Sequence, residues 1–99
     1  MDEALRRLTH ELGHSSHMGV KVLKIIHGYG SSGAGGRIRI EARKYLDRLK
    51  QQGKIKAYIP GESFSIFQEE TRMAFQFCDA LRQDRDLDRH NNGVTFIVL

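Results

Sequence analysis

The stretch VKVLKIIHGYGSSGAGGRIR, residues 20–39, decides how this sequence is interpreted. It begins with an apolar, β-branched run from Val20 to Ile26, as expected for a buried strand. Five glycines and two serines follow within residues 27–36, and a basic, helix-periodic stretch begins at Arg37. A strand, a glycine-rich turn and a positively charged helix start form an arrangement that can hold an anion.

The composition describes one small domain. Its 99 residues are 39% hydrophobic and include five Phe and three Tyr, which is enough apolar surface for one core. No apolar stretch approaches the length of a membrane span and no signal peptide is visible, so no membrane partner is expected. Cys78 is the single cysteine, which excludes an internal disulfide and favours a cytoplasmic location.

The positive charge is concentrated in the part of the chain that contains the glycine turn. The net charge is +4, but residues 1–60 carry 12 Lys and Arg against 5 Asp and Glu, whereas residues 61–99 carry 4 against 7. A local excess of this kind favours phosphate-bearing partners through counterion release. A solvated basic face without a specific partner is the alternative.

Two helices and a strand are predicted in the first half of the chain. Apolar side chains recur at helical spacing in residues 2–17 and 36–52, and Gly19 and Gly53 follow as stop signals. Residues 20–27 are apolar on both alternations, which predicts a strand covered on both faces. Helix, strand, glycine turn and helix in this order predict an α/β unit with parallel strands.

The second half predicts two strands around a helix. Residues 54–59 alternate between apolar and polar side chains, as in a half-buried strand. A third helix is predicted over residues 65–82, with Ser65 and Gln68 as a capping box. A final strand is predicted over residues 94–99.

The glycine-rich turn and the helix after it supply the candidate phosphate ligands. Glycine permits positive φ and a close approach of ligand to backbone, so N–H groups of the turn and of the first helical turn can bind an anion. Arginine side chains of the helix add charge-assisted contacts. A flexible turn without a ligand is the alternative. The candidate nucleic-acid-binding residues are Gly28, Tyr29, Gly30, Ser31, Ser32, Gly33, Arg37, Arg39, Arg43 and Lys44.

His27 is the candidate catalytic residue. It ends the predicted strand directly before the glycine turn, where α/β folds place working residues. An imidazole there can act as general base, as general acid or as hydrogen-bond donor to a phosphate. The alternative is a histidine that hydrogen-bonds the loop backbone and shapes the turn.

Residues 28–33 also match the pattern GxGxxG, which raises a nucleotide-binding α/β domain as a further hypothesis. The context disfavours a dinucleotide, because a helix precedes the strand and Glu62 follows later than the ribose-binding acid should. No Gly-Lys-Ser/Thr follows the glycines, which argues against a phosphate-loop ATPase.

No metal site is predicted from the sequence. A metal could bridge two of His10, His14 and His17, but nothing completes the site, and a solvated histidine face is favoured. Aspartates alternate within residues 84–88 like the start of a calcium loop, but the later glycine and glutamate positions do not match. Cys78 fits a core position. No cofactor is expected, and whether cleavage would need a divalent metal stays open.

The sequence around the glycine turn resembles the Smr (small MutS-related) domain family, which carries an HGxG loop followed by a basic helix. The resemblance rests on Ile25-Ile26-His27-Gly28-Tyr29-Gly30, Ser32-Gly33 and Arg37-Ile38-Arg39, and extends to Glu3-Ala4-Leu5 and residues 54–60 and 93–99. It implies a two-layer α/β sandwich that binds DNA or RNA, and several members of the family are nicking or RNA-cleaving endonucleases. His27, Gly28 and Gly30 would then take the loop role, and Arg37 and Arg39 would contact phosphates.

Two departures from the family pattern shape the expected fold. The family opens with a strand ending in an Asp-Leu-His-Gly motif, whereas Met1 here directly precedes the first helix. The unpaired sheet edge that results invites a homodimer or strand exchange. Residues 62–92 form an insertion where a short loop is usual. We therefore expect one Smr-like domain over residues 1–99, an α/β (α+β) two-layer sandwich with a small mixed sheet of about three strands packed by two helices, plus an inserted third helix.

Nucleic-acid binding is the favoured function, with DNA or RNA as partner and with DNA-nicking or RNA endonuclease activity as the associated hypothesis. The HGxG loop and the basic second helix would hold the phosphate backbone. A non-catalytic protein-interaction or dimerisation module is the alternative, docked through the third helix and the exposed sheet edge.

Overall fold

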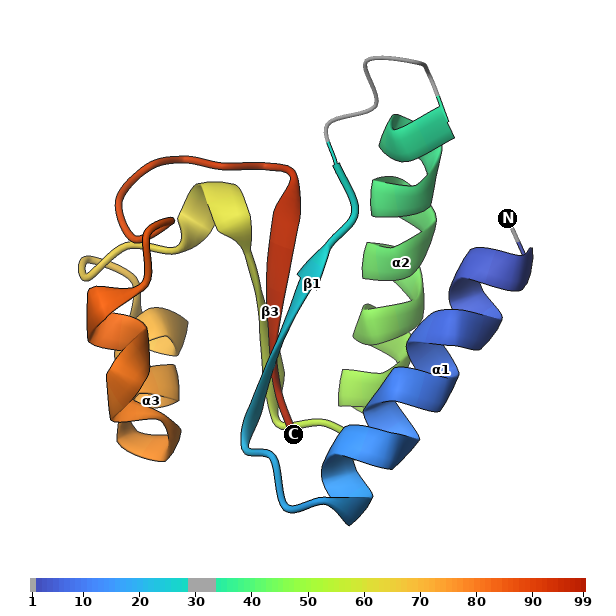
Figure 1. Ribbon diagram of the computed structural model, residues 1–99, viewed down its shortest axis with the longest axis horizontal. Helices are drawn as coiled ribbons and strands as arrows, with labels where there is room; N and C mark the ends of the chain where they lie inside the picture. The colour runs from blue at the N-terminus through green and yellow to red at the C-terminus, as the bar shows by residue number, and fades with distance from the viewer. Residues whose placement is uncertain (1, 29–33) are drawn as a thin grey trace.

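The structure is a computed structural model that describes residues 2–28 and 34–99 (Figure 1). A three-stranded sheet lies between helices on both of its faces. The elements in chain order are α1 (Asp2–His17), β1 (Val22–Ile26), α2 (Ala34–Gln51), β2 (Ala57–Pro60), the short 3-10 helix η1 (Gly61–Ser63), α3 (Glu69–Phe77), the 3-10 helix η2 (Asp79–Gln83) and β3 (Val94–Val98).

β3 lies in the middle of the sheet and pairs antiparallel with both of its neighbours. Its Ile97 stands opposite Leu23 of β1 on one side and Tyr58 of β2 on the other. β1 and β2 therefore run in the same direction without pairing. The expected α+β fold is confirmed, but the expectation of a mixed sheet with parallel neighbours is wrong for the described strands, because the last strand of the chain enters between the first two.

Successive side chains of β3 point to opposite faces of the sheet and contribute to two separate halves of the core. Val94, Phe96 and Val98 pack with apolar residues of β2, α3 and η2. Ile97 packs with apolar residues of α1 and α2. Figure 1 shows the same division, with α1 and α2 on one side of the sheet and α3 on the other. The sheet and its two helices are the two layers that were expected, and the segment after β2 adds a third.

The third layer is held to the sheet by three aromatic rings. Phe96 is fully buried, and its ring centroid lies 4.0 Å from that of Phe64, the first residue after η1. Phe75 of α3 meets Phe64 edge-on, with ring centroids 6.3 Å apart. Burying side chains of this size contributes about 2–3 kcal/mol each, so Phe64 and Phe75 make this segment part of the domain's core.

The predicted helix α1 has the bounds that were expected, and α2 differs from its prediction by no more than two residues at either end. Each is followed by a glycine in the left-handed region, Gly19 at φ +79° and Gly53 at φ +74°, which explains why the helices stop there. β1 is shorter than predicted, and Ile26 at its end is 77% exposed. The expectation that β1 is covered on both faces holds for Val22 and Leu23, which join opposite halves of the core.

The single third helix predicted over residues 65–82 is wrong in its continuity. Cys78, in extended conformation at φ −149°, separates α3 from η2. Ser65 does not cap a helix: the N-cap is Gln68, and the Ser65 hydroxyl accepts a hydrogen bond from the Phe67 amide. Ala74 and Leu81 both pack into the same half of the core, one on either side of the break.

Candidate nucleic-acid interface

His27 follows the last residue of β1 and is tied to two neighbouring segments. Its Nε2 lies 2.9 Å from the hydroxyl of Thr95 in β3, and its Nδ1 lies 3.0 Å from the carbonyl oxygen of Gly28. A carbonyl oxygen can only accept, so Nδ1 carries the proton and the lone pair of neutral Nε2 accepts from Thr95. Both ring nitrogens are thus engaged within the protein, as expected for a histidine that shapes the backbone around Gly28, and a catalytic role of His27 stays a prediction.

The charge state of His27 is set by its surroundings. Burial lowers the pKa of His27, and the positive charges of Arg43 and Arg39 lower it further, against the hydrogen bond to Gly28 and the charge of Glu62. With a pKa below the usual 6.5, the imidazole is neutral at neutral pH. A neutral imidazole can accept a proton but carries no charge with which to hold a phosphate.

Gly28 has φ +84°, in the left-handed region that glycine adopts readily. Its amide, like that of His27, donates to the carbonyl oxygen of Gly93 at 3.0 Å. Neither amide is therefore available to an anion, and the contribution of Gly28 is to the course of the backbone. The other predicted loop residues, Tyr29, Gly30, Ser31, Ser32 and Gly33, lie outside the described residues.

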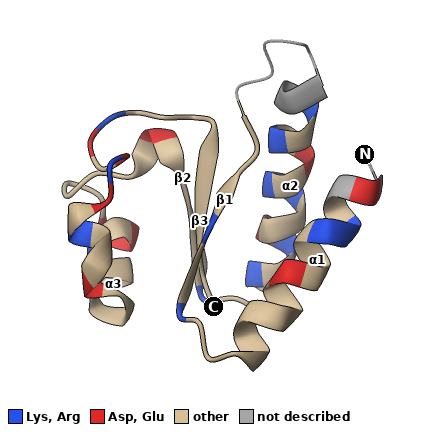
Figure 2. Cartoon of the chain, viewed as in Figure 1, with Lys and Arg blue, Asp and Glu red and all other residues tan. Residues whose placement is uncertain are grey.

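The basic residues of α2 fall on two faces. Arg39 and Arg43 are one helical turn apart, are half-buried, and carry the charges that act on His27. Arg37 and Lys44 are two turns apart on a different face and are exposed. Figure 2 shows basic residues recurring along α2, whereas acidic residues are frequent after β2. The structure thus brings Arg39 and Arg43 to His27, and contact of Arg37 and Lys44 with nucleic acid stays a prediction.

Glu62 of η1 joins this group, although the sequence did not suggest it. Both nitrogens of the Arg43 guanidinium fork donate to the Glu62 carboxylate at 2.8 Å. Burial would raise the pKa of Glu62, but its hydrogen bonds and the charges of Arg43 and Arg39 outweigh burial and hold it below the usual value. Arg43 Nε is buried and has no hydrogen-bond partner among the described residues.

A signal for Glu62 was present in the sequence, but only the strand directions make it usable. β1 and β2 run in the same direction, so their carboxyl ends lie at the same end of the sheet, on either side of β3. Glu62 comes two residues after β2 ends at Pro60, as His27 comes one residue after β1. We call His27, Gly28, Arg39, Arg43 and Glu62 together the His27 corner.

The sequence model of the Smr domain family matches residues 1–63 of this chain. The chain belongs to the Smr domain family. The matched segment contains every member of the His27 corner and ends with η1. No curated protein and no solved structure matches the chain.

An open groove of about 630 Å³ adjoins the His27 corner of this Smr domain. It is lined by residues 23–26 of β1, by His27, by Ile38 of α2 and by Glu3, Arg7, Leu8 and Glu11 of α1. The groove follows the edge of β1 that does not face β3. It therefore places solvent-accessible apolar surface, flanked by charges of both signs, directly beside His27.

The remaining candidate sites have structural explanations. The rings of His10 and His14 stack 6.3 Å apart on the exposed face of α1, and the described residues contain no group of three His, Cys, Asp or Glu that could hold a metal ion. Asp84 and Asp86 are bound to Lys24. Cys78 is half-buried against the core. None of the helices in residues 2–28 and 34–99 is long and apolar enough to cross a membrane.

Proposed function

We propose that this Smr domain binds the phosphate backbone of DNA or RNA at the His27 corner. The observation that carries the proposal is that the charges of Arg39 and Arg43 act on His27 at the end of β1 and that Glu62 holds the Arg43 guanidinium in one orientation. Guanidinium groups recognise phosphate oxygens bidentately and retain their charge at any physiological pH. Membership of the Smr family and the positive charge of residues 1–60 support the same conclusion.

The ion pair with Glu62 defines how Arg43 would be used. Glu62 fixes the fork of Arg43 in one orientation, which reduces the side-chain entropy lost when a phosphate binds. It also occupies two of the five guanidinium N–H groups and places a negative charge next to the phosphate position. Buried Arg43 Nε, which has no partner in the described chain, is a donor that Glu62 leaves unused.

We propose in addition that His27 acts as the base in phosphodiester cleavage. Once the hydrogen bond from the Thr95 hydroxyl is broken, neutral Nε2 would take the proton of an attacking 2′-hydroxyl or water as that oxygen bonds to phosphorus. The bond from phosphorus to the leaving oxygen then breaks, and this oxygen takes a proton from solvent. Glu62 cannot donate that proton at neutral pH, because its lowered pKa keeps it ionised.

Binding is tested by the fluorescence anisotropy of labelled single-stranded RNA and duplex DNA as a function of salt. Arg39→Gln and Arg43→Gln should each weaken binding and reduce the slope of log K against log salt by about 0.7 on single strands. Arg48→Gln, in the same helix but exposed on another face, is the control and should change neither quantity. Slopes unaffected by both site variants would refute the proposed interface.

Cleavage is tested on the same labelled strands by denaturing gels, with and without magnesium. His27→Gln should abolish product formation, whereas His14→Gln, on the exposed face of α1, should retain the wild-type rate. Equal rates for wild type and His27→Gln would exclude His27 as the base. Intact substrate with the wild type, together with salt-dependent binding, would leave a binding domain without catalysis.

A second candidate function is self-association through β1. Along β1, the backbone N–H and C=O groups of successive residues point alternately toward β3 and away from it. The N–H and C=O groups of Val22, Lys24 and Ile26 point away and have no strand partner within the described residues. Pairing of two such edges would produce a homodimer with a continuous sheet. Light scattering coupled to gel filtration should then give twice the chain mass, and Ile26→Lys should restore the monomer. A monomeric wild type across the accessible concentration range would exclude the dimer.

A further inference from the structure

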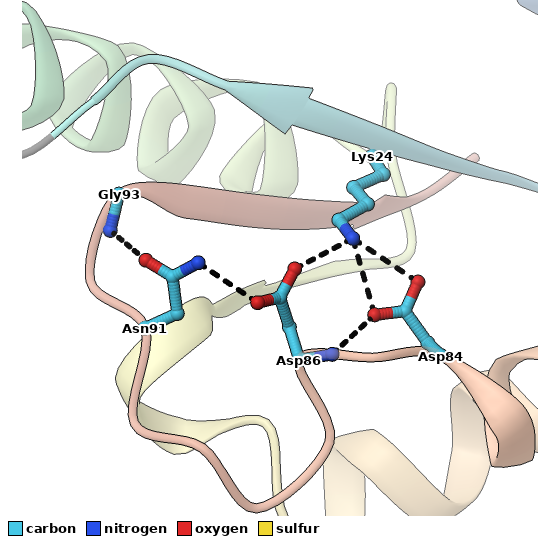
Figure 3. Close-up of polar contacts among 5 residues, drawn as sticks. All are labelled: Lys24, Asp84, Asp86, Asn91 and Gly93. Carbon is cyan, nitrogen blue, oxygen red and sulfur yellow. Dashed lines mark hydrogen bonds and ion pairs between the residues drawn. The ribbon is translucent and has the colours of Figure 1, made fainter.

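A chain of polar contacts connects the loop before β3 to the centre of β1 (Figure 3). The ammonium group of Lys24 lies 2.6 Å from Asp86 and 3.1 Å from Asp84. Asp84 also accepts from the Asp86 amide at 2.8 Å, which fixes the two carboxylates relative to each other. The side chain of Asp86 is 9% exposed, so this pairing is held inside the protein and is little screened by salt.

The same chain of contacts continues from Asp86 to the backbone at Gly93. The Asn91 side-chain amide donates to Asp86 at 2.8 Å, and its carbonyl oxygen accepts from the Gly93 amide at 2.9 Å. The amide nitrogen can only donate and the amide oxygen can only accept, so these two hydrogen bonds fix the orientation of the Asn91 side-chain amide. Figure 3 shows Asn91 between Asp86 and Gly93, with Lys24 reaching the network from β1.

Gly93 in turn holds the start of the glycine turn. Its carbonyl oxygen accepts from the amides of both His27 and Gly28, each at 3.0 Å. The position of this one oxygen therefore determines where β1 ends and where Gly28 takes up its positive φ. Two residues further on, Thr95 binds the His27 ring, so the entry of β3 controls both the backbone and the side chain of His27.

We propose that Asn91 and Asp86 are positioning residues for the His27 corner, acting through Gly93. They lie in the segment after β2, beyond the part that matches the Smr domain, and their side chains make no hydrogen bond or ion pair with Arg39 or Arg43 among the described residues. This inference rests on the proposed function only for its effect on nucleic-acid binding. Its effect on the backbone of His27 and Gly28 is independent of any ligand.

The charges in the network are consistent with a fixed structural unit. Hydrogen bonds from Asn91 and Lys24 outweigh burial and lower the pKa of Asp86. Burial would lower the pKa of Lys24, but its bonds to Asp86 and Asp84 raise it above the ordinary value. Both groups therefore remain charged across the physiological range, and the network does not depend on pH there.

The variant that tests this is Asn91→Ala, with Asn92→Ala as matched control. Asn92 is the neighbouring residue of the same type and its side chain makes no hydrogen bond within the described chain. Hydrogen exchange followed by NMR should show the His27 and Gly28 amides exchanging about tenfold faster in Asn91→Ala, the change expected when about one hydrogen bond is lost. The amide of Ile97, in the middle of β3, should keep its protection in both variants.

The second measurement is the affinity for labelled single-stranded RNA as a function of salt. Asn91→Ala should weaken binding about three- to tenfold without changing the salt slope, because no phosphate contact is removed. Arg43→Gln should change the slope, which separates loss of positioning from loss of a contact. Should Asn91→Ala fail to fold, Asn91→Ser keeps an acceptor for the Gly93 amide but replaces the amide that donates to Asp86 with a shorter hydroxyl, and an intermediate effect is expected.

The two measurements have separate outcomes. Unchanged exchange of His27 and Gly28 in folded Asn91→Ala would overturn the positioning role. Faster exchange with unchanged affinity would overturn its importance for binding. A wild-type protein that does not bind nucleic acid would refute the proposed function, while the exchange rates would still decide whether Asn91 positions the backbone.

Discussion

Replacing Glu62 by glutamine should lower the stability of the domain and raise its affinity for nucleic acid. The pair that it forms with Arg43 is bidentate, with both contacts at 2.8 Å, and the two side chains are 39% and 17% exposed respectively. Exposed pairs contribute about 0.2–1 kcal/mol, and breaking a buried pair costs about 3–5 kcal/mol. Because Glu62 is more than one third exposed and glutamine keeps an acceptor, we expect a loss of about 1 kcal/mol. For a domain of this size that corresponds to a melting temperature about 4–8 °C lower.

The affinity should change in the opposite direction, because the substitution removes a negative charge and releases one of the two Arg43 N–H groups that the carboxylate holds. One additional phosphate contact would increase the salt slope by about 0.7 on single-stranded RNA. A net gain of about 1 kcal/mol corresponds to binding about fivefold tighter at moderate salt.

Thermal unfolding and anisotropy titrations on the same samples measure both effects. Glu41→Gln is the matched control, since it changes the net charge equally but removes only an exposed pair with Lys44 at 3.9 Å. It should leave the melting temperature unchanged and increase affinity less than Glu62→Gln. If Glu62→Gln weakened binding in parallel with stability, or matched Glu41→Gln in affinity, Arg43 would not be the phosphate ligand that Glu62 restrains.

Four further predictions concern the scaffold. A Cβ on Gly61 would overlap the carbonyl oxygen of Asn91 and lie within 2.7 Å of the carbonyl oxygen of Val94, so Gly61→Ala should unfold or severely destabilise the domain. Gly13 has open space around it, so Gly13→Ala should instead stabilise α1 by about 0.5–1 kcal/mol in denaturant titrations. Phe96→Ala should cost about 3–5 kcal/mol in the same titrations, because the ring is fully buried between the sheet and α3, and a cost below 1 kcal/mol would contradict this packing. Burial and the hydrogen bond to Asp47 raise the pKa of Tyr58 to about 12, so ultraviolet titration should show one phenol ionising near that pH. The free energy of unfolding should fall as the pH rises from about 10 toward 12, because the unfolded chain loses this proton first. Ionisation of Tyr58 near pH 10 would refute the environment described.

Local patterns in the sequence predicted the elements around the glycine turn. The bounds of α1, the positions of Gly19 and Gly53 beyond the helix ends and the strand before His27 all depend on the nearest few residues. Helical spacing also predicts that the basic residues of α2 fall on two faces, because Arg39 and Arg43 lie one turn apart. The prediction of a continuous third helix failed because the apolar periodicity runs through Cys78 and cannot detect a single residue in extended conformation.

The composition of the site required the tertiary structure. Glu62 lies 19 residues from Arg43, and Asp84 lies 60 residues from Lys24, so no spacing rule links these pairs. Position in the chain alone cannot place Glu62 beside His27. The carboxyl ends of β1 and β2 lie at the same end of the sheet only because both strands pair antiparallel with β3.

The sequence by itself determined the helices next to the glycine turn, the strand that leads into it and His27 as the residue of interest, because hydrophobic periodicity and glycine chemistry act over a few residues. Only the tertiary structure decided that β3 lies between β1 and β2, that the segment after β2 covers the second face of the sheet, and that Asn91 reaches Gly93 behind His27. Strand order and long-range polar contacts depend on how complete faces are buried against each other, and that information is distributed over the whole chain.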